Sequence, residues 1–155
     1  MGVSRERSVV ALFGTYDSSS WRDRFIARYD ELGITYYNPI GEKRDIAAEV
    51  VQLSTAPIVL LPITSDSTGF ESLVEVGFAA GSLHLNPTRT LVTYIAPTVS
   101  QSVRLRDLEL ADASNRARKL AIAHLAYLKS PQIILVNDLT EMLMKSIELC
   151  GVKNS

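Results

Sequence analysis

Two glutamates, Glu71 and Glu75, lie in a segment of small and apolar residues that spans residues 69–81. This segment directly follows the strongest strand candidate, residues 58–63. A strand that ends in a polar loop and continues into a helix brings the first helical turns to the carboxyl edge of a sheet, where open α/β folds bind ligands. A carboxylate there is able to act as a nucleophile, a general base or an anchor for a hydroxyl group. The alternative is that both glutamates are solvated helix residues.

The elements that must position these glutamates alternate between strands and helices. Strands are expected at residues 8–14, 34–37, 58–63, 90–95 and 132–136. Helices are expected at residues 21–32, 45–55, 70 to about 81–85, 113–129 and 139–149, and the indistinct segment 98–112 predicts at most a short helix. Such alternation is typical of a parallel sheet covered on both faces. We therefore predict a doubly wound, flavodoxin-like α/β fold with five parallel strands.

Length and composition point to one domain over residues 1–155, with 46% hydrophobic and 21% charged residues. The net charge of -1 gives no electrostatic reason to expect nucleic acid or an anionic membrane as a partner. No apolar run has the length of a membrane span. The single cysteine, Cys150, has no partner within the chain, which favours a reducing, cytoplasmic compartment.

The expected carboxyl edge of the sheet is rich in hydroxyl and amide groups. It presents residues 14–16, Asn38, residues 64–68 and Ala96. The chain has no cysteine cluster, and its two histidines, His84 and His124, fall in helices, which argues against a metal site and against a Ser-His-Asp triad. Neither a GxGxxG nor a P-loop motif occurs. We therefore expect a carboxylate-driven site for a polyhydroxylated ligand, with no cofactor.

Four stretches, taken in order, carry a family resemblance. They are Leu-Phe-Gly-Thr at residues 12–15 leading to Ser-Trp-Arg at 20–22, Gly-Ile-Thr-Tyr-Tyr-Asn-Pro at 33–39, Glu-Val-Gly-Phe-Ala at 75–79, and Asn-Arg-Ala-Arg at 115–118. The set resembles the nucleoside 2-deoxyribosyltransferase superfamily, in particular its branch of short deoxyribosyltransferase-like proteins. Each stretch alone is a weak signal, but their order, the chain length and the expected architecture agree.

The resemblance implies a retaining mechanism. Glu75 matches the family glutamate that attacks the anomeric carbon of a 2′-deoxynucleoside, forms a covalent deoxyribosyl-enzyme and releases the base, after which a second nucleobase or water resolves the intermediate. It also implies that Glu49, on the second helix, contacts the base. The alternative for Glu49 is a solvated helix glutamate, and the two interpretations are equally supported by the sequence.

The chain departs from the family at two positions. Gly69 stands where typical transferases carry an aspartate six residues before the glutamate, and we expect Asp66 or Thr68 to substitute for it. Leu12 stands where they carry a tyrosine, and Tyr16 is the candidate substitute from the following loop. These departures leave open hydrolysis of a nucleoside, a nucleoside 5′-monophosphate or a related nucleotide, and also a non-catalytic nucleotide-binding module.

A phosphate on the substrate has candidate partners in the first loop. Monophosphate hydrolases of the superfamily hold it with loop serines and an arginine, which match Ser18, Ser19, Ser20 and Arg22 here. The alternative is that the serines cap the helix that follows.

The remaining candidate contacts each have a structural alternative. Gly14 and Thr15 belong to the first loop, Trp21 either stacks on a base or packs in the core, and Asn38 either contacts ligand or shapes a turn. Asn115 is a candidate hydroxyl contact, which the family resemblance implies across a subunit interface. The neighbouring Arg116 and Arg118 are otherwise surface charges.

The helix around residues 120–128 carries more apolar surface than one core face requires, which predicts a homo-oligomer. The alternative is a fully buried helix.

Overall fold

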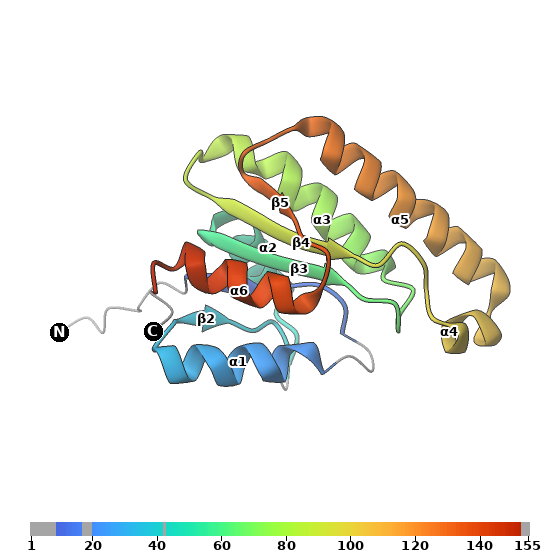
Figure 1. Cartoon of the computed structure of the whole chain (residues 1–155), viewed down its shortest axis with the longest axis horizontal. Coiled ribbons are helices and arrows are strands. Elements are labelled where there is room, and N and C mark those ends of the chain that lie inside the picture. Colours follow the sequence, from blue (N-terminus) through green and yellow to red (C-terminus); the bar gives the residue numbers. More distant parts are fainter. Residues whose placement is uncertain (1–8, 17–19, 42, 153–155) are drawn as a thin grey trace.

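The computed structural model of the protein describes residues 9–16, 20–41 and 43–152. Its centre is a sheet of five parallel strands in the order β2-β1-β3-β4-β5 (Figure 1). The strands are β1 (Val10–Leu12), β2 (Tyr36–Tyr37), β3 (Ile58–Ile63), β4 (Thr90–Ile95) and β5 (Ile133–Leu135). This is the strand order of flavodoxin-like folds, in which ligands bind where the order reverses, between β1 and β3. The predicted fold class is confirmed.

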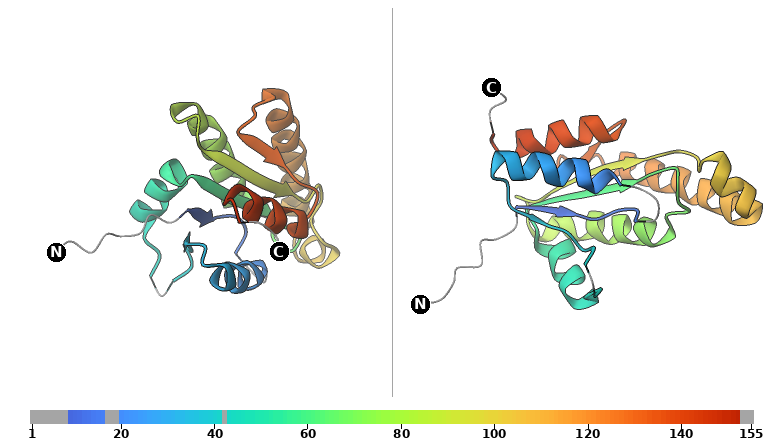
Figure 2. Two further views of the ribbon diagram at one scale, coloured as in Figure 1. Left: turned by 60° about the vertical axis from the view of Figure 1, so that its left-hand side comes forward. Right: turned by 90° about the horizontal axis from the view of Figure 1, so that it is seen from below.

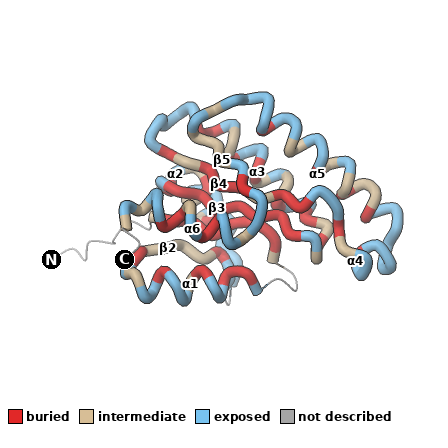
Figure 3. Tube along the Cα trace, viewed as in Figure 1, coloured by how far each residue is buried: buried red, intermediate tan, exposed pale blue. Residues whose placement is uncertain are grey.

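Helices cover both faces of the sheet, as the two views of Figure 2 show. One face carries α1 (Trp21–Leu32) and α6 (Leu139–Leu149), and the other carries α2 (Ile46–Thr55), α3 (Phe70–Ser82) and α5 (Leu108–Leu128). Successive residues of a strand point to opposite faces, so Tyr36 packs with the α1 and α6 side and Tyr37 with the α2, α3 and α5 side. The central strands β1, β3 and β4 are mostly buried, whereas the outer strands β2 and β5 are not (Figure 3).

The strand β3 lies at the centre of the sheet and all six of its residues are buried. It nevertheless contains Pro62, which has no N–H to donate to a neighbouring strand. Phe13 and Thr15 still donate their backbone N–H groups to Leu60 and Pro62, at 2.9 and 3.0 Å. Because Pro62 has no N–H to donate back to the neighbouring segment, β1 ends at Leu12, earlier than the predicted residue 14. The predicted first residue of that strand, Ser8, lies outside the described residues.

The segment around residue 107 differs most from the prediction. Residues 98–112 contain the short α4 (Gln101–Arg106), as expected, but α5 begins at Leu108 and not at residue 113. Asp107 separates the two helices and accepts a hydrogen bond from the backbone N–H of Leu110 at 2.9 Å. An aspartate that caps the first turn starts the helix earlier than the apolar periodicity indicates.

The end of α3 agrees with the prediction, since a single 3₁₀ turn, η1 (Leu83–Leu85), follows it. Across the described ranges, no helix combines the length and the apolar character needed to cross a bilayer.

Candidate functional site

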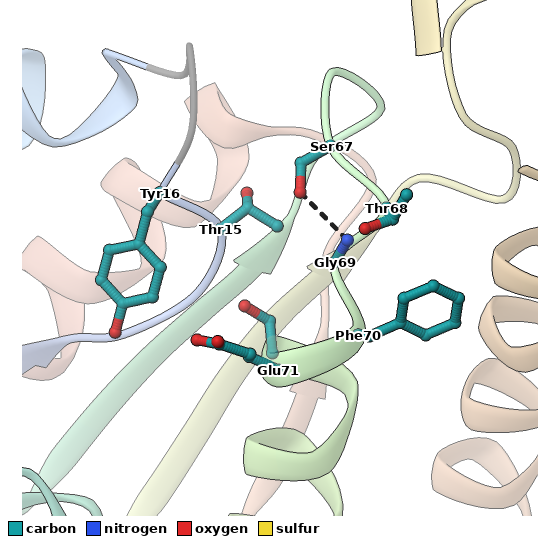
Figure 4. Close-up of a pocket in the computed structure, with 8 residues that line it drawn as sticks. Thr15, Tyr16, Ser67, Thr68, Gly69, Phe70 and Glu71 are labelled. Carbon is teal, nitrogen blue, oxygen red and sulfur yellow. Dashed lines mark hydrogen bonds between the residues drawn. The ribbon is translucent and has the colours of Figure 1, made fainter. Parts of the chain in front are cut away.

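A pocket of about 480 Å³ opens at the carboxyl edge of the sheet, between the loop after β1 and the first turn of α3 (Figure 4). It is lined by Thr15, Tyr16, Ser67, Thr68, Gly69, Phe70, Glu71 and Ser72. Four of these, Thr15, Tyr16, Thr68 and Glu71, are residues for which the sequence predicts a ligand contact. The pocket therefore lies at the predicted edge of the sheet.

A smaller hollow of about 220 Å³ lies on the other side of Tyr16. Its remaining lining residues are Pro39, Ile40, Gly41, Arg44 and Glu49. The carboxylate of Glu49 is buried and accepts hydrogen bonds from Arg44, the closest at 3.0 Å. The solvated-helix interpretation of Glu49 is therefore wrong. The ring of Tyr16 borders both spaces.

Glu75 lies one helical turn after Glu71 on α3. Its Oε2 atom is buried and has no hydrogen-bond partner within the described part of the chain. The pKa of Glu75 is raised from 4.5 to about 7, mainly by burial and then by the negative charges of Glu49 and Glu71, while Arg44 and Arg22 oppose the rise. A carboxylate that is desolvated and unpaired is unfavourable for stability and is often found at functional sites.

Tyr16 shares this environment. Its hydroxyl oxygen is also buried without a partner among the described residues. Burial raises the pKa of Tyr16 to about 12, and the negative charges of Glu75 and Glu49 contribute. The phenol is therefore protonated at neutral pH and has a free O–H to donate to a ligand. A free phenol O–H is what Tyr16 needs if it is to substitute for the tyrosine that the family resemblance implies at Leu12.

Leu12, at the position of that tyrosine, is fully buried in the core beneath α1. It has no route to the pocket, so Tyr16 is the phenol that this chain places there.

Arg44 connects the helices α2 and α3 above the smaller hollow. Its guanidinium lies 3.0 Å from Glu49 and 3.4 Å from Glu71, and its side chain is half exposed. The pair with Glu71 is exposed on both sides and contributes little to stability, whereas the Glu49 carboxylate is buried. The effect of Arg44 on the site is electrostatic, because it is the first of the cations that lower the pKa of Glu75. Arg44 has no distinguishing neighbour in the sequence, so this role is visible only in the structure.

The loop after β3 is held by short polar contacts. The Thr15 hydroxyl lies 2.6 Å from that of Thr64, and the backbone N–H of Thr64 donates to Thr15 at 3.2 Å. Ser67 accepts from the backbone N–H of Gly69 at 3.0 Å, which Figure 4 shows as a dashed line. Thr15 thus joins the loops after β1 and β3, and its hydroxyl is engaged by protein groups.

Gly69 begins α3 with a left-handed backbone, at φ of 67°. A Cβ at this position would lie 2.7 Å from a methyl carbon of Ile63 and 3.2 Å from a nitrogen of Arg118. Residues other than glycine avoid such a backbone, and this one is crowded as well. The aspartate that the family resemblance implies here would be strained and crowded in this local geometry. Of its two predicted substitutes, Thr68 lines the pocket, whereas Asp66 bonds to the Thr64 hydroxyl.

Gly14 has a comparable structural role at the end of β1. Its φ is 101°, and a Cβ would lie 2.3 Å from the carbonyl oxygen of Pro62. Its close approach to β3 explains the glycine without a ligand.

Ser72 is a pocket residue that the sequence analysis missed. It is 2% exposed and lines the pocket. Its place in the first turn of α3, at the carboxyl edge, is the signal that would have found it. Ser67, the other lining serine, lies within residues 64–68, which the sequence predicts at this edge.

Three predicted contacts are engaged by the protein itself. Trp21 is buried in the core against Phe25, and its indole N–H donates to the Thr15 carbonyl at 3.1 Å. Asn38 accepts from the backbone N–H of Ile40 at 3.2 Å, which is its turn-forming alternative. Asn115 accepts from the backbone N–H of Val99 at 2.8 Å and holds the loop before α4.

The first loop offers less to a phosphate than predicted. Ser18 and Ser19 lie outside the described residues, and Ser20 precedes α1 without a side-chain capping bond. Arg22 is buried, with its guanidinium 4.8 Å above the Tyr16 ring, and burial lowers its pKa to about 10. It donates to the carbonyls of residues 12, 14 and 15. Arg22 therefore orders the loop and is not presented to a ligand.

The two arginines of the late motif differ. Arg116 is exposed, as a surface charge would be, whereas Arg118 is completely buried, so the surface interpretation of Arg118 is wrong. Its N–H groups donate to the loops that form the pocket. Periodicity alone gives no sign of this, because α5 reads as polar around residue 116.

No family model and no curated protein matches the sequence. Among solved structures, the protein is similar to the crystal structure of the RPS4 and RRS1 TIR domain heterodimer, with a TM-score of 0.56 and 10% identity over 95% of this chain and 100% of that one. It is also similar to a conserved protein from Enterococcus faecalis V583, with a TM-score of 0.50 and 10% identity over 90% of this chain and 98% of that one. At this identity the likeness shows a shared fold alone.

Proposed function

We propose that this protein is a nucleoside 2-deoxyribosyltransferase that uses Glu75 as its nucleophile. The observation that carries the proposal is that the buried Oε2 of Glu75 and the hydroxyl of Tyr16 both lack a partner among the described residues, and that the two groups are close enough for the charge of Glu75 to raise the pKa of Tyr16. Tyr16 lines both pockets, and Glu75 follows the pocket residue Glu71 by one helical turn, so the two atoms are suited to a ligand that supplies the missing hydrogen bonds.

The proposed reaction has two displacements at C1′ of the sugar. The ionised Glu75 forms a bond to C1′ while the C1′–N bond breaks and its electron pair leaves with the base, which takes up a proton. An incoming base then attacks C1′, loses a proton and expels the carboxylate. Both transition states carry positive charge on the sugar, which the negative charge of Glu75 stabilises. The two proton transfers cancel over one turnover.

The neighbouring residues have distinct roles in this proposal. Tyr16 donates its O–H to the sugar or to Glu75, and Thr68 and Ser72 contact sugar hydroxyls in the larger pocket. Glu49, with Arg44 beside it, contacts the base in the smaller hollow. The mixed apolar and charged lining of that hollow, with Ile40 and Glu49, is suited to a flat polar ring.

The test is a set of incubations with each 2′-deoxynucleoside, with and without a different free base, resolved by chromatography. The expected result is a new nucleoside that Glu75→Gln does not form, together with a deoxyribosyl adduct on the parent protein by mass spectrometry. Glu148→Gln, an exposed glutamate of α6, is the matched control. No new nucleoside and no adduct with any substrate would reject the transferase.

Hydrolysis of a nucleoside, a nucleoside 5′-monophosphate or a related nucleotide is the second candidate. The observation that favours it is Gly69, whose geometry would strain and crowd the aspartate of typical transferases. A hydrolase would release free base without an acceptor, again only with Glu75 present. The same incubations, extended to 5′-monophosphates, separate the two reactions.

We also propose that the protein forms a homo-oligomer through α3 and α5. A groove of about 510 Å³ between these helices is almost wholly apolar, and Val74, Leu120 and Phe78 on or beside it are exposed. Because α5 keeps this exposed side, its alternative as a fully buried helix is wrong. Phe70 lines both the groove and the candidate pocket, so a second copy seated there would lie beside the site. A cytoplasmic setting, in which the free thiol of Cys150 stays reduced, is part of the same proposal.

A further inference from the structure

Arg118 is a large side chain that is completely buried, with a relative exposure of 0%. It extends from α5 beneath the start of α3. A buried arginine is expensive unless its N–H groups are all satisfied. The contacts that satisfy them show what Arg118 holds in place.

All five N–H donors of Arg118 have acceptors, and four of these are main-chain carbonyls. The two Nη1 donors bond to Ile63 and Ala96, at 3.2 and 2.9 Å, where β3 and β4 end. The two Nη2 donors bond to Thr64 and Ser67, at 2.9 and 2.7 Å. One guanidinium thus joins two strand ends and the loop that leads into α3.

The fifth donor extends this network to the residue before Gly69. Arg118 Nε donates to the Ser114 hydroxyl at 3.0 Å, and that hydroxyl donates to the Thr68 carbonyl at 2.6 Å. Gly69 packs directly on the guanidinium, since a Cβ there would lie 3.2 Å from Nη2. The backbone from 67 to 69 is therefore held from below by side chains of α5.

We propose that Arg118 is a positioning residue of the candidate site, which acts through Ser114 and the turn at residues 67–69 to fix the first turns of α3. Those turns carry Glu71, Ser72 and Glu75. The planar guanidinium, with five donors in a rigid fork, reaches carbonyls from several segments at once, which a lysine ammonium cannot do. This inference deepens the proposed function and rests on it only for its consequence on turnover.

The chain contains a matched control for this proposal. Arg89 is also buried, at 2% exposure, and donates to the carbonyls of Leu53 and Ala56 and to the Ser82 hydroxyl. It joins the ends of α2 and α3 to the start of β4, at the edge of the sheet opposite to the pocket. Arg118→Lys and Arg89→Lys therefore make the same chemical change at similar burial, near the site and far from it.

The experiment follows the titration of the Glu75 carboxyl by ¹³C NMR in the full chain, which requires no catalytic activity. The charged groups that act on Glu75 are Glu49, Glu71, Arg44 and Arg22, and none of them bonds to Arg118. Arg118→Lys keeps the buried charge but releases the turn, so water reaches Glu75 and its titration midpoint falls by about half a unit or more. Ser114→Ala, a milder change, is expected to lower the midpoint in the same direction.

Arg89→Lys is expected to lower the urea midpoint of unfolding while the Glu75 titration stays where it is in the parent. If the parent is active, kcat falls at least about 10-fold in Arg118→Lys and stays near the parent value in Arg89→Lys. An unchanged Glu75 titration in folded Arg118→Lys and Ser114→Ala, or an equal shift in Arg89→Lys, would overturn the proposal. If the parent is inactive but Arg118→Lys shifts the Glu75 titration, the positioning role of Arg118 is supported and the proposed enzymatic activity is rejected. Failure of one proposal is therefore distinguishable from failure of the other.

Discussion

Tyr16 and Glu75 each bury one oxygen that has no hydrogen-bond partner among the described residues, and the charge of Glu75 helps to raise the pKa of Tyr16. One comes from the loop after β1 and the other from α3, so only the tertiary fold brings them into one electrostatic environment. Buried polar atoms are nearly always paired in folded proteins. Two exceptions in one place indicate a site whose partners arrive with a ligand.

Glu75→Gln is expected to stabilise the protein at alkaline pH while it abolishes turnover. The folded pKa of about 7 lies above the unfolded value of 4.5, so ionised Glu75 opposes folding. Below pH 4.5 both states are protonated and the variant gains nothing. As pH rises through 7 the parent loses stability, and the variant gains on the order of 1–2 kcal/mol, a figure reduced for partial exposure.

Urea unfolding of parent and Glu75→Gln at pH 4.5 and pH 8 measures this difference, with Glu148→Gln as the control. Equal stabilities at pH 8 would show that Glu75 is not held in a desolvated, ionised form. The accompanying loss of turnover is expected to be on the order of 10³-fold or more, as for other nucleophiles.

Arg44→Gln is expected to move the acid limb of the pH–rate profile to higher pH. Arg44 lowers the pKa of Glu75, so its removal raises that pKa and delays the ionisation that a nucleophile requires. Because Arg44 is half exposed, the shift is expected to be less than about one unit and to shrink in high salt. Arg28→Gln, which breaks an exposed pair with Glu31, should leave the limb in place.

Tyr16→Phe is expected to separate activity from stability. The hydroxyl makes no hydrogen bond within the described structure, so its removal should change the free energy of unfolding by less than about 0.5 kcal/mol. Turnover is expected to fall roughly 10²-fold if the O–H donates to the reacting sugar or to Glu75. Tyr127→Phe, at an 83% exposed position, is the control for the assay. A large loss of stability in Tyr16→Phe would instead give the hydroxyl a structural role.

Gly69→Ala and Gly33→Ala form a matched pair at the same φ of 67°. A Cβ at Gly33 meets nothing within 4 Å, so the cost there is backbone strain, about 1 kcal/mol. At Gly69 the Cβ also meets Ile63 and Arg118, which brings the expected cost to about 3 kcal/mol. Chemical denaturation of both variants measures the difference, and equal costs would mean that the turn at residues 67–69 is not packed as described.

Val74→Lys is expected to convert the proposed oligomer into a monomer. Val74 is 74% exposed on α3 beside the apolar groove, so the lysine disturbs no core contact. Sedimentation velocity of the parent and the variant at equal concentration tests this. Lys145→Ala on α6, across the sheet, should leave the assembly unchanged, and a monomeric parent would reject the proposed interface.

The sequence by itself determined the element order, because apolar runs such as residues 58–63 and glycine stops such as Gly33 are local signals. It also placed Glu71 and Glu75 at the carboxyl edge, since parallel strands bring their ends to one side. The sequence pattern predicted the wrong start for α5, because the capping residue Asp107 extends this helix beyond its apolar pattern.

Only the tertiary structure decided which polar side chains are hydrogen-bonded to other protein groups and which keep an atom without a partner. Arg22 and Arg118 read as a ligand contact and a surface charge in sequence, yet burial and hydrogen bonds to backbone carbonyls make them internal supports. Trp21 and Asn115 are likewise engaged by backbone groups near the pocket. The unpartnered state of Tyr16 and Glu75 depends on what every other segment supplies around them. Whether a polar atom has a hydrogen-bond partner depends on the three-dimensional structure, and the spacing of residues along the chain does not encode it.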